Sequence, residues 1–155
     1  MLTQEMVIDE EIQLSTEIRE LISLIGGLTE AQLTTFLRFL CVRHCNAGER
    51  IFLEGDLPSN IYILTCGRVD LVVEKNGVPA IQNVFKPGDT FGETAVIGIQ
   101  NQLGTAIASG DDVELLVLSR EALINILETD IELYGILMMN IARDVSRKLH
   151  VNALS

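Results

Sequence analysis

The sequence has few of the residues that metal centres and disulfide frameworks need. It contains two histidines and three cysteines in 155 residues. Metal sites use clustered histidine, cysteine and carboxylate groups, and a serine or cysteine nucleophile needs a base nearby, so we expect neither a metalloenzyme nor any other enzyme. An odd number of cysteines fits a reducing cytoplasm better than a disulfide framework. The spacing of Cys41 and Cys45 could suggest a metal or redox site, but we interpret both as buried, inert thiols.

Basic residues and long apolar runs are also scarce. Lysine and arginine number 11 against 22 acidic residues, which gives a net charge of −11. Nucleic-acid binding depends on neutralising phosphates, and anionic membranes attract basic segments, so this charge disfavours both partners. No run reaches the roughly 18 apolar residues of a membrane span, and the acidic N-terminus lacks the apolar core of a signal peptide. We therefore expect a cytoplasmic protein that binds neither nucleic acid nor membrane directly.

Two helices are predicted before the β-rich part of the chain. Isoleucines recur every three or four residues over residues 1–25, which predicts an amphipathic helix that ends at Gly26-Gly27. This helix either packs on the domain or forms an additional oligomer contact. Thr29 and Gln32 form a capping box, which predicts a second helix running to about Cys41. The expected domains are a helical extension, residues 1–27, and a main domain, residues 28–155.

Short strands and turns follow from about residue 46 to residue 118. Asn76-Gly77 favours a type I′ hairpin turn, because both central residues of that turn take positive φ. Many short strands at intervals of about 8–12 residues indicate a sandwich or barrel. The expected strands are Arg50–Leu53, Ile61–Leu64, Val69–Val73, Ile81–Phe85 and Val113–Leu118.

Helices are predicted again over residues 119–151. Ser119 is suited to cap the first of them. The last helix, Ile131 to about Val151, carries a stripe in which apolar residues alternate in steps of four and three, as in a coiled-coil seam. This stripe either pairs with a second copy of the chain or only packs on the barrel. Its members are Tyr134, Met138, Ile141 and Val145.

The stretch from Lys86 to Leu118 contains the best candidate for a binding site. Gly92 removes a side chain from the backbone, so a ligand can approach the bare N–H groups there. Glu93 places a carboxylate beside them that can accept hydroxyl groups. The alternative is a simple glycine bend inside a β-rich domain.

Several motifs resemble the cyclic-nucleotide-binding domain family. Phe91-Gly92-Glu93-Thr94-Ala95 is similar to the start of its phosphate-binding cassette, and AGERIFLEGD (residues 47–56) and Gly67-Arg68-Val69 are similar to the front half of its domain. The resemblance covers roughly residues 28–150. It implies a mainly β fold with α: a double-stranded β-helix or jelly-roll β-roll, flanked by N-terminal helices and a C-terminal helix of the dimerisation type.

The family also implies which residues bind. In its members the cassette glycine and neighbouring N–H groups meet the cyclic phosphate, the glutamate takes the ribose 2′-hydroxyl, and an arginine pairs with the phosphate. The last helix supplies base contacts, for which Lys148 and Asn152 are candidates here. The candidate binding residues are Phe91, Gly92, Glu93, Thr94, Ala95, Gln102, Leu103, Gly104 and Thr105, with Gln100 as a further polar group.

The cassette arginine has no counterpart in this sequence. Its position falls on Gln102 or Leu103, and nothing between Lys86 and Arg120 is Lys, Arg or His. We therefore expect a pocket without a buried cation. A charge-assisted pair contributes about 1.5–3 kcal/mol, so its loss implies roughly ten- to hundredfold weaker binding.

The resemblance implies a non-catalytic regulatory or sensor module. It would bind cAMP or cGMP weakly, or another small ligand, and relay binding through the C-terminal helix. We expect a homodimer through Ile131–Val151 and a possible protein partner. Related bacterial transcription regulators carry a DNA-binding helix-turn-helix after this helix, whereas this sequence ends at Ser155, so a DNA-binding role would need a partner. The alternative is a divergent domain that binds no nucleotide and serves protein interaction or dimerisation.

Overall fold

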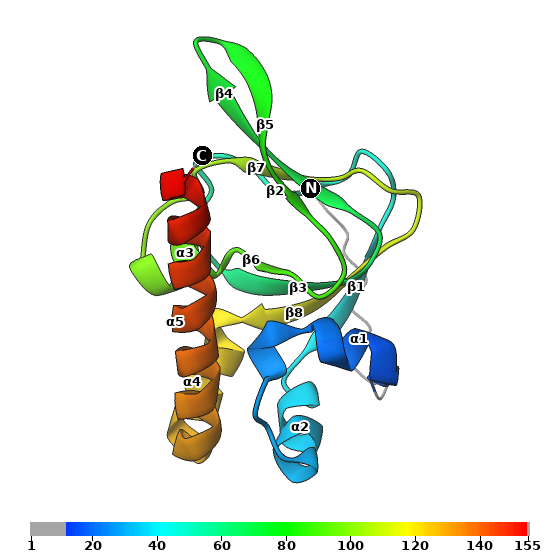
Figure 1. Cartoon of the computed structure of the whole chain (residues 1–155), viewed down its shortest axis with the longest axis vertical. Coiled ribbons are helices and arrows are strands. Elements are labelled where there is room, and N and C mark those ends of the chain that lie inside the picture. The colour runs from blue at the N-terminus through cyan, green and yellow to red at the C-terminus, as the bar shows by residue number, and fades with distance from the viewer. Residues whose placement is uncertain (1–11, 155) are drawn as a thin grey trace.

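A computed structural model describes residues 12–154, with side chains to residue 150. Two four-stranded antiparallel sheets form a β-roll, with strand orders β1-β8-β3-β6 and β2-β7-β4-β5 (Figure 1). This architecture confirms the predicted β-roll. The strands are β1 (Cys41–Cys45), β2 (Arg50–Phe52), β3 (Asn60–Cys66), β4 (Val69–Lys75), β5 (Val78–Phe85), β6 (Thr90–Phe91), β7 (Thr105–Ala108) and β8 (Val113–Ser119).

The helices flank this roll. In Figure 1 the N-terminal helices and α4 lie below the sheet that contains β1, β8 and β3, while α5 runs along one side of the roll. None of the helices in the described part of the chain is long and apolar enough to cross a membrane. The helices are α1 (Thr16–Leu21), the 3-10 helix η1 (Ser23–Ile25), α2 (Glu30–Leu37), α3 (Glu93–Gly98), α4 (Arg120–Thr129) and α5 (Ile131–Leu154).

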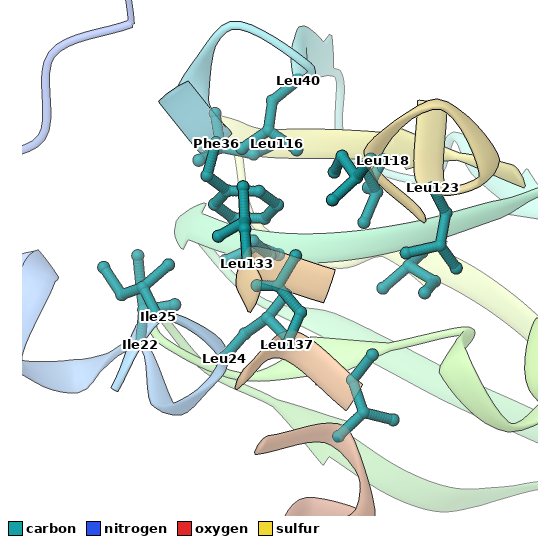
Figure 2. Packing of buried hydrophobic residues seen from close by; sticks show 14 of the residues in the cluster. Ile22, Leu24, Ile25, Phe36, Leu40, Leu116, Leu118, Leu123, Leu133 and Leu137 are labelled. Atoms are coloured by element: carbon teal, nitrogen blue, oxygen red, sulfur yellow. The ribbon is translucent and has the colours of Figure 1, made fainter. Parts of the chain in front are cut away.

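The sheet with β3 and β8 is buried on both faces. Side chains of a strand alternate between the two faces, so Ile61 and Ile63 pack toward the helices, whereas Tyr62 and Leu64 point into the roll. The first set joins a core beneath the helices, which we call the helical core (Figure 2). The second set joins the interior of the roll. Burial on both faces explains the nearly continuous apolar runs of these strands.

Three local predictions are confirmed by geometry. Asn76 and Gly77 take φ values of 56° and 77°, as a type I′ hairpin requires. In the capping box the Gln32 N–H donates to Thr29 Oγ1 at 3.1 Å, and the Thr29 N–H donates to Gln32 Oε1 at 2.9 Å. Ser119 caps α4 by accepting a hydrogen bond from the Ala122 N–H at 3.0 Å.

The prediction of one long N-terminal helix is wrong within the described residues. Residues 12–15 are not helical, because Ser15 takes an extended conformation and its hydroxyl caps α1 by accepting from the Ile18 N–H. The helix stops again at Ile22, which is also extended. Residues 1–11 of the prediction lie outside the described part of the chain. Ile22, Leu24 and Ile25 are buried in the helical core, so this segment packs on the domain; an oligomer contact stays a prediction.

The roll begins earlier than predicted. The helix that was expected to reach Cys41 ends at Leu37, and residues 41–45 form β1, which pairs along its whole length with β8. Pairing with a central strand overrides the local helical pattern here. Cys45 is buried, and burial raises the pKa of its thiol to about 12, with a hydrogen bond to Glu49 adding to the effect. Cys41 and Cys66 are half-buried. Of the two cysteines that we interpreted as buried thiols, Cys41 and Cys45, only Cys45 is therefore fully buried.

The predicted coiled-coil stripe of α5 faces this chain's own core. Ile141 is buried in the helical core, and Tyr134, Met138 and Val145 pack against it. Asn140 anchors the same face, because its Nδ2 donates to the carbonyl oxygens of Leu24 and Gly26, both at 2.8 Å. The stripe therefore packs on the domain, as one of the two interpretations required.

Candidate ligand-binding site

A cavity of about 290 Å³ lies between residues 91–105, which we call the cassette, strand β5 and the C-terminal part of α5. Its floor is aromatic. The rings of Phe85 and Phe91 stack with centroids 4.8 Å apart, and Tyr62 stacks behind Phe91 at 5.2 Å. The centroid of the Phe52 ring lies 5.9 Å from that of Tyr62 and 6.2 Å from that of Phe91. These rings come from four separate strands, so only the folded roll brings them together.

Gly92 sets the course of the cassette. Its φ is +83°, and a Cβ there would lie 3.0 Å from the Asn60 carbonyl oxygen and 3.3 Å from the Tyr62 ring. A residue with a side chain would be strained and would clash. This turn starts α3, a short helix that the sequence analysis did not predict. Glu93 is its first residue, and its side chain points into the protein with 1% exposure.

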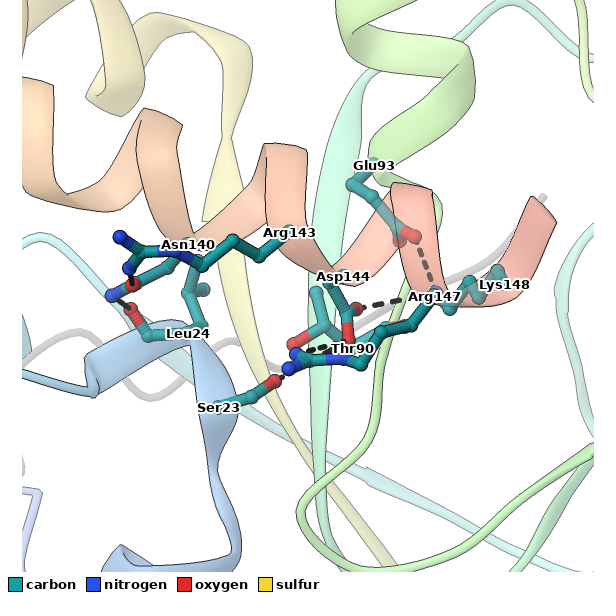
Figure 3. Close-up of polar contacts among 9 residues, drawn as sticks. All are labelled: Ser23, Leu24, Thr90, Glu93, Asn140, Arg143, Asp144, Arg147 and Lys148. Atoms are coloured by element: carbon teal, nitrogen blue, oxygen red, sulfur yellow. Dashed lines mark hydrogen bonds and ion pairs between the residues drawn. The ribbon is translucent and has the colours of Figure 1, made fainter. Parts of the chain in front are cut away.

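Glu93 is paired with Lys148 of α5 (Figure 3). Lys148 Nζ donates to Glu93 Oε1 and to the Thr90 carbonyl oxygen at 2.7 Å, and it lies 3.5 Å from Asp144 Oδ2. We expected a pocket without a buried cation, and the cation found beside Glu93 is partly exposed, because 34% of the Lys148 side chain is accessible. The cation comes from a helix 55 residues further along the chain, outside the stretch in which an arginine was sought.

The environment of the Glu93 carboxyl is nearly dry. Burial raises its pKa above the ordinary value of 4.5, while the charge and hydrogen bond of Lys148 act in the opposite direction. Glu93 Oε2 is buried and has no hydrogen-bond partner among the described residues, and the same holds for Thr90 Oγ1. A buried polar atom without a partner costs about 1–3 kcal/mol. Such an acceptor is suited to a ligand that brings its own donor.

Eight of the nine predicted site residues line this cavity. The exception is Thr105, whose hydroxyl accepts from the Glu54 N–H at 3.0 Å. The lining residues are Phe91, Gly92, Glu93, Thr94, Ala95, Gln102, Leu103 and Gly104.

The two candidate arginine positions differ in exposure. Gln102 is buried and its backbone is fixed, because it accepts from the Gly55 N–H at 2.7 Å and donates to the Asp56 carbonyl at 2.9 Å. Leu103 is 74% exposed, so its side chain lies at the edge of the cavity.

Sequence reasoning missed part of the lining. Gln82 and Asn83 of β5 and Leu71 of β4 line the cavity, and Val145 and Leu149 of α5 close it on another side. These residues lie on an ordinary strand or helix, so no local sequence pattern marks them as part of a binding site. Lys148 was considered only for base contacts, and Asn152 lies beyond the described side chains. Within residues 12–154, no group of three or more His, Cys, Asp or Glu could hold a metal ion.

Comparison with known proteins identifies the family. The sequence profile of the cyclic nucleotide-binding domain matches residues 42–130, more than half of the chain. The chain therefore belongs to the cyclic nucleotide-binding domain family, whose members are regulatory binding modules.

Individual relatives agree with this assignment. The human (Homo sapiens) cGMP-dependent protein kinase 2 is 32% identical over 102 residues, which are 64% of this chain and 13% of the kinase. The curated relatives it matches first are much longer, and the chain spans 13–14% of their length.

Solved structures share the fold. A cyclic nucleotide-binding domain from Methylobacillus flagellatus superimposes with a TM-score of 0.79 at 16% identity, covering 86% of this chain and 79% of that one. The catabolite activator protein of Thermus thermophilus gives a TM-score of 0.75 at 27% identity, covering 85% and 60%.

Proposed function

We propose that this domain is a non-catalytic regulatory module in which a ligand in the cavity acts on α5 through the ion pair of Lys148 and Glu93. One observation carries the proposal: a buried cassette carboxylate is held by a lysine of the last helix, at the wall of the cavity. A ligand group that approaches Glu93 either competes with Lys148 for the carboxylate or strengthens the ion pair between Lys148 and Glu93. Either effect gives the ligand a different affinity for two positions of α5, and that difference is what a switch requires.

Polar contacts continue from Lys148 along α5 to the N-terminal segment (Figure 3). Asp144 Oδ2 faces Lys148, while its Oδ1 accepts from the Ser23 hydroxyl at 3.4 Å. One turn earlier, Asn140 holds the carbonyl groups of Leu24 and Gly26. A shift of α5 at the cavity would therefore reach η1.

The family supplies the first ligands to consider. The matched relatives include a kinase named for its dependence on cGMP and a catabolite activator protein. For this chain we propose weak binding of cAMP or cGMP, or of another small ligand, because no basic residue occupies the arginine position of the cassette. The composition favours a cytoplasmic site of action.

Hydrogen exchange tests the coupling without any ligand. Replacing Lys148 with Met removes the cation but keeps most of the apolar stem. We expect faster amide exchange in α3 and in residues 141–150 of α5. Arg147→Met is the matched control, because Arg147 pairs with Asp144 and not with Glu93. Unchanged exchange in α3 of Lys148→Met would contradict the proposal.

A second candidate function is dimerisation through the outer face of α5. Ile131 and Met139 are 64% and 54% exposed on that face, and the small residues Gly135 and Ala142 are exposed beside them. Small residues allow two helices to approach closely. This face, rather than the predicted stripe, would then contact the second copy of the chain. The resulting dimer could bind a protein partner.

Sedimentation tests this candidate. A dimer is expected for the unmodified chain, and Met139→Glu should convert it to a monomer by placing a charge in the contact. Thr34→Glu adds the same charge to an exposed position of α2 and should leave the dimer intact. A monomeric unmodified chain at high concentration would rule out dimerisation.

A further inference from the structure

The cavity has no net positive charge to offer an anion. Among the described residues that line it, only Glu93 and Lys148 have ionisable side chains, and they are paired with each other. The ammonium group of lysine has three donors, and here they face Glu93, the Thr90 carbonyl and Asp144. An anion would have to displace a carboxylate from Lys148, and it would approach a protein whose net charge is −11.

The cavity does offer an acceptor. Glu93 Oε1 is taken by Lys148, but Oε2 is buried without a partner in the described part of the chain. A carboxylate oxygen only accepts hydrogen bonds. A hydroxyl group of a ligand could satisfy Oε2 without breaking the pair with Lys148.

The rest of the lining is suited to a neutral, partly apolar ligand. Phe52, Phe85 and Phe91 give it an aromatic wall that needs no charged partner. Phe91 is stacked between Phe85 and Tyr62, and Lys148 Nζ lies 5.8 Å from the centroid of the Phe85 ring, so this wall is apolar surface rather than a free stacking face. Side-chain amides, which both donate and accept, surround it and match the ring nitrogens and carbonyls of a base. They belong to Gln82, Asn83, Gln100, Asn101 and Gln102. The volume of about 290 Å³ lies just below the usual range of ligand cavities, which is about 300 to 1,000 Å³.

We propose that the cavity takes an uncharged nucleoside, with a ribose hydroxyl on Glu93 Oε2 and the base against the aromatic and amide side chains of the lining, in preference to a cyclic nucleotide. This inference rests on the proposed ligand-responsive role of the same cavity and names its ligand class. Neutral amides and a neutralised lysine recognise the sugar and base but leave a phosphate without a cation.

Calorimetric titration with matched pairs tests the inference on the full chain. Adenosine is compared with cAMP and guanosine with cGMP, because each pair shares the base and ribose but differs in the charged phosphate. At least one nucleoside should bind about tenfold more tightly than its cyclic partner. Its affinity should change little between low and high salt, because no charge is neutralised. Glu93→Gln should weaken it about tenfold, since an amide is a poorer acceptor for the ribose hydroxyl.

A cation placed at the arginine position sharpens the test. Leu103 is exposed at the edge of the cavity, so Leu103→Arg should fold normally. It should tighten the binding of cAMP or cGMP about tenfold relative to the corresponding nucleoside. Leu103→Gln is the matched control, with a polar side chain and no charge, and should not change this ratio.

Two results would overturn the inference. Cyclic nucleotides that bind the unmodified chain as tightly as nucleosides would refute the preference and leave the ligand-responsive role intact. Failure of both nucleosides to bind at millimolar concentration would refute the ligand class. The exchange experiment on Lys148→Met needs no ligand, so it decides the proposed function separately.

Discussion

The two sides of the sheet formed by β1, β8, β3 and β6 differ in how completely their buried polar groups are hydrogen-bonded. On the side of the helices, aliphatic side chains fill the helical core, and the buried Asn140 donates to two carbonyl groups. On the side of the roll, the interior ends in an aromatic floor, and Glu93 Oε2 and Thr90 Oγ1 are buried without partners among the described residues. One side is filled by apolar packing and paired polar groups, whereas the other leaves buried polar atoms without partners.

Backbone strain follows the same division. Ile99 ends α3 with φ +51° and ψ +46°, a left-handed conformation that is costly for a β-branched residue. Gly92, at the start of the same helix, also has positive φ. Unsatisfied polar groups and strained backbone are typical of functional sites. The cassette contains one of each among the described residues, Glu93 Oε2 and Ile99, which is consistent with the proposal that it responds to a ligand.

The largest expected effect lies in the helical core. Leu137 is fully buried there, so Leu137→Ala should lower the free energy of unfolding by about 2–5 kcal/mol through lost burial and a cavity. Urea denaturation measures this loss. The control Ser146→Ala, at an exposed position of the same helix, should change the free energy of unfolding by less than about 0.5 kcal/mol. Similar costs for both substitutions would refute the described orientation of α5.

The next effect is expected at the cavity and depends on pH. Lys148→Met should lower the free energy of unfolding by about 1–3 kcal/mol at neutral pH, because it leaves the Glu93 carboxylate buried and unpaired. The pKa of Glu93 is already above its unfolded value, and losing Lys148 raises it further. Stability associated with protonated Glu93 is fully present below pH 4.5 and is lost as the pH rises through the folded pKa.

The cost of Lys148→Met should therefore be smaller near pH 5 than at neutral pH. Denaturation at both pH values measures the difference. Arg147→Met should show no such trend, because its guanidinium contacts Asp144 and is largely exposed. A pH-independent cost for Lys148→Met would mean that Glu93 does not depend on the lysine.

A smaller difference is expected between Gly92→Ala and its matched control. Positive φ alone costs an alanine about 1–2 kcal/mol, and here the Cβ would also press on the Asn60 carbonyl. Gly77→Ala is a matched control, because Gly77 has φ +77° with no atom within 4 Å of the added Cβ. We expect Gly92→Ala to cost about 1 kcal/mol more than Gly77→Ala. Equal unfolding free energies would show that the close approach to Asn60 is not restrictive.

The smallest effect should be a gain. Ile99→Gly relieves the left-handed strain at a side chain that is 80% exposed, so it should raise the free energy of unfolding by about 0.5–1 kcal/mol. Ile97→Gly lies inside α3 and should lower stability instead. A loss of stability in Ile99→Gly would indicate that the isoleucine makes a contact that offsets its strain.

Local signals predicted the short strands and the helix starts, whereas the β-roll itself was predicted through the resemblance to the family. The hairpin at Asn76-Gly77, the capping box at Thr29 and the cap at Ser119 each depend on a few neighbouring residues. The cassette was found through its resemblance to a family pattern. Lys148 could not be assigned to Glu93 from the sequence, because their meeting depends on how α5 docks on the helical core. The early start of the roll was also missed, since β1 forms by pairing with a distant strand.

A double-mutant cycle of Glu93→Gln and Lys148→Met tests most directly whether the cassette and α5 are coupled. Urea denaturation of the two single variants, the double variant and the unmodified chain gives the interaction free energy. The structure predicts that the double variant loses at least about 1 kcal/mol less than the sum of the single losses, because the pair is buried at the glutamate and in direct contact. Losses that add to within about 0.3–0.5 kcal/mol would contradict the coupling on which the proposed function depends.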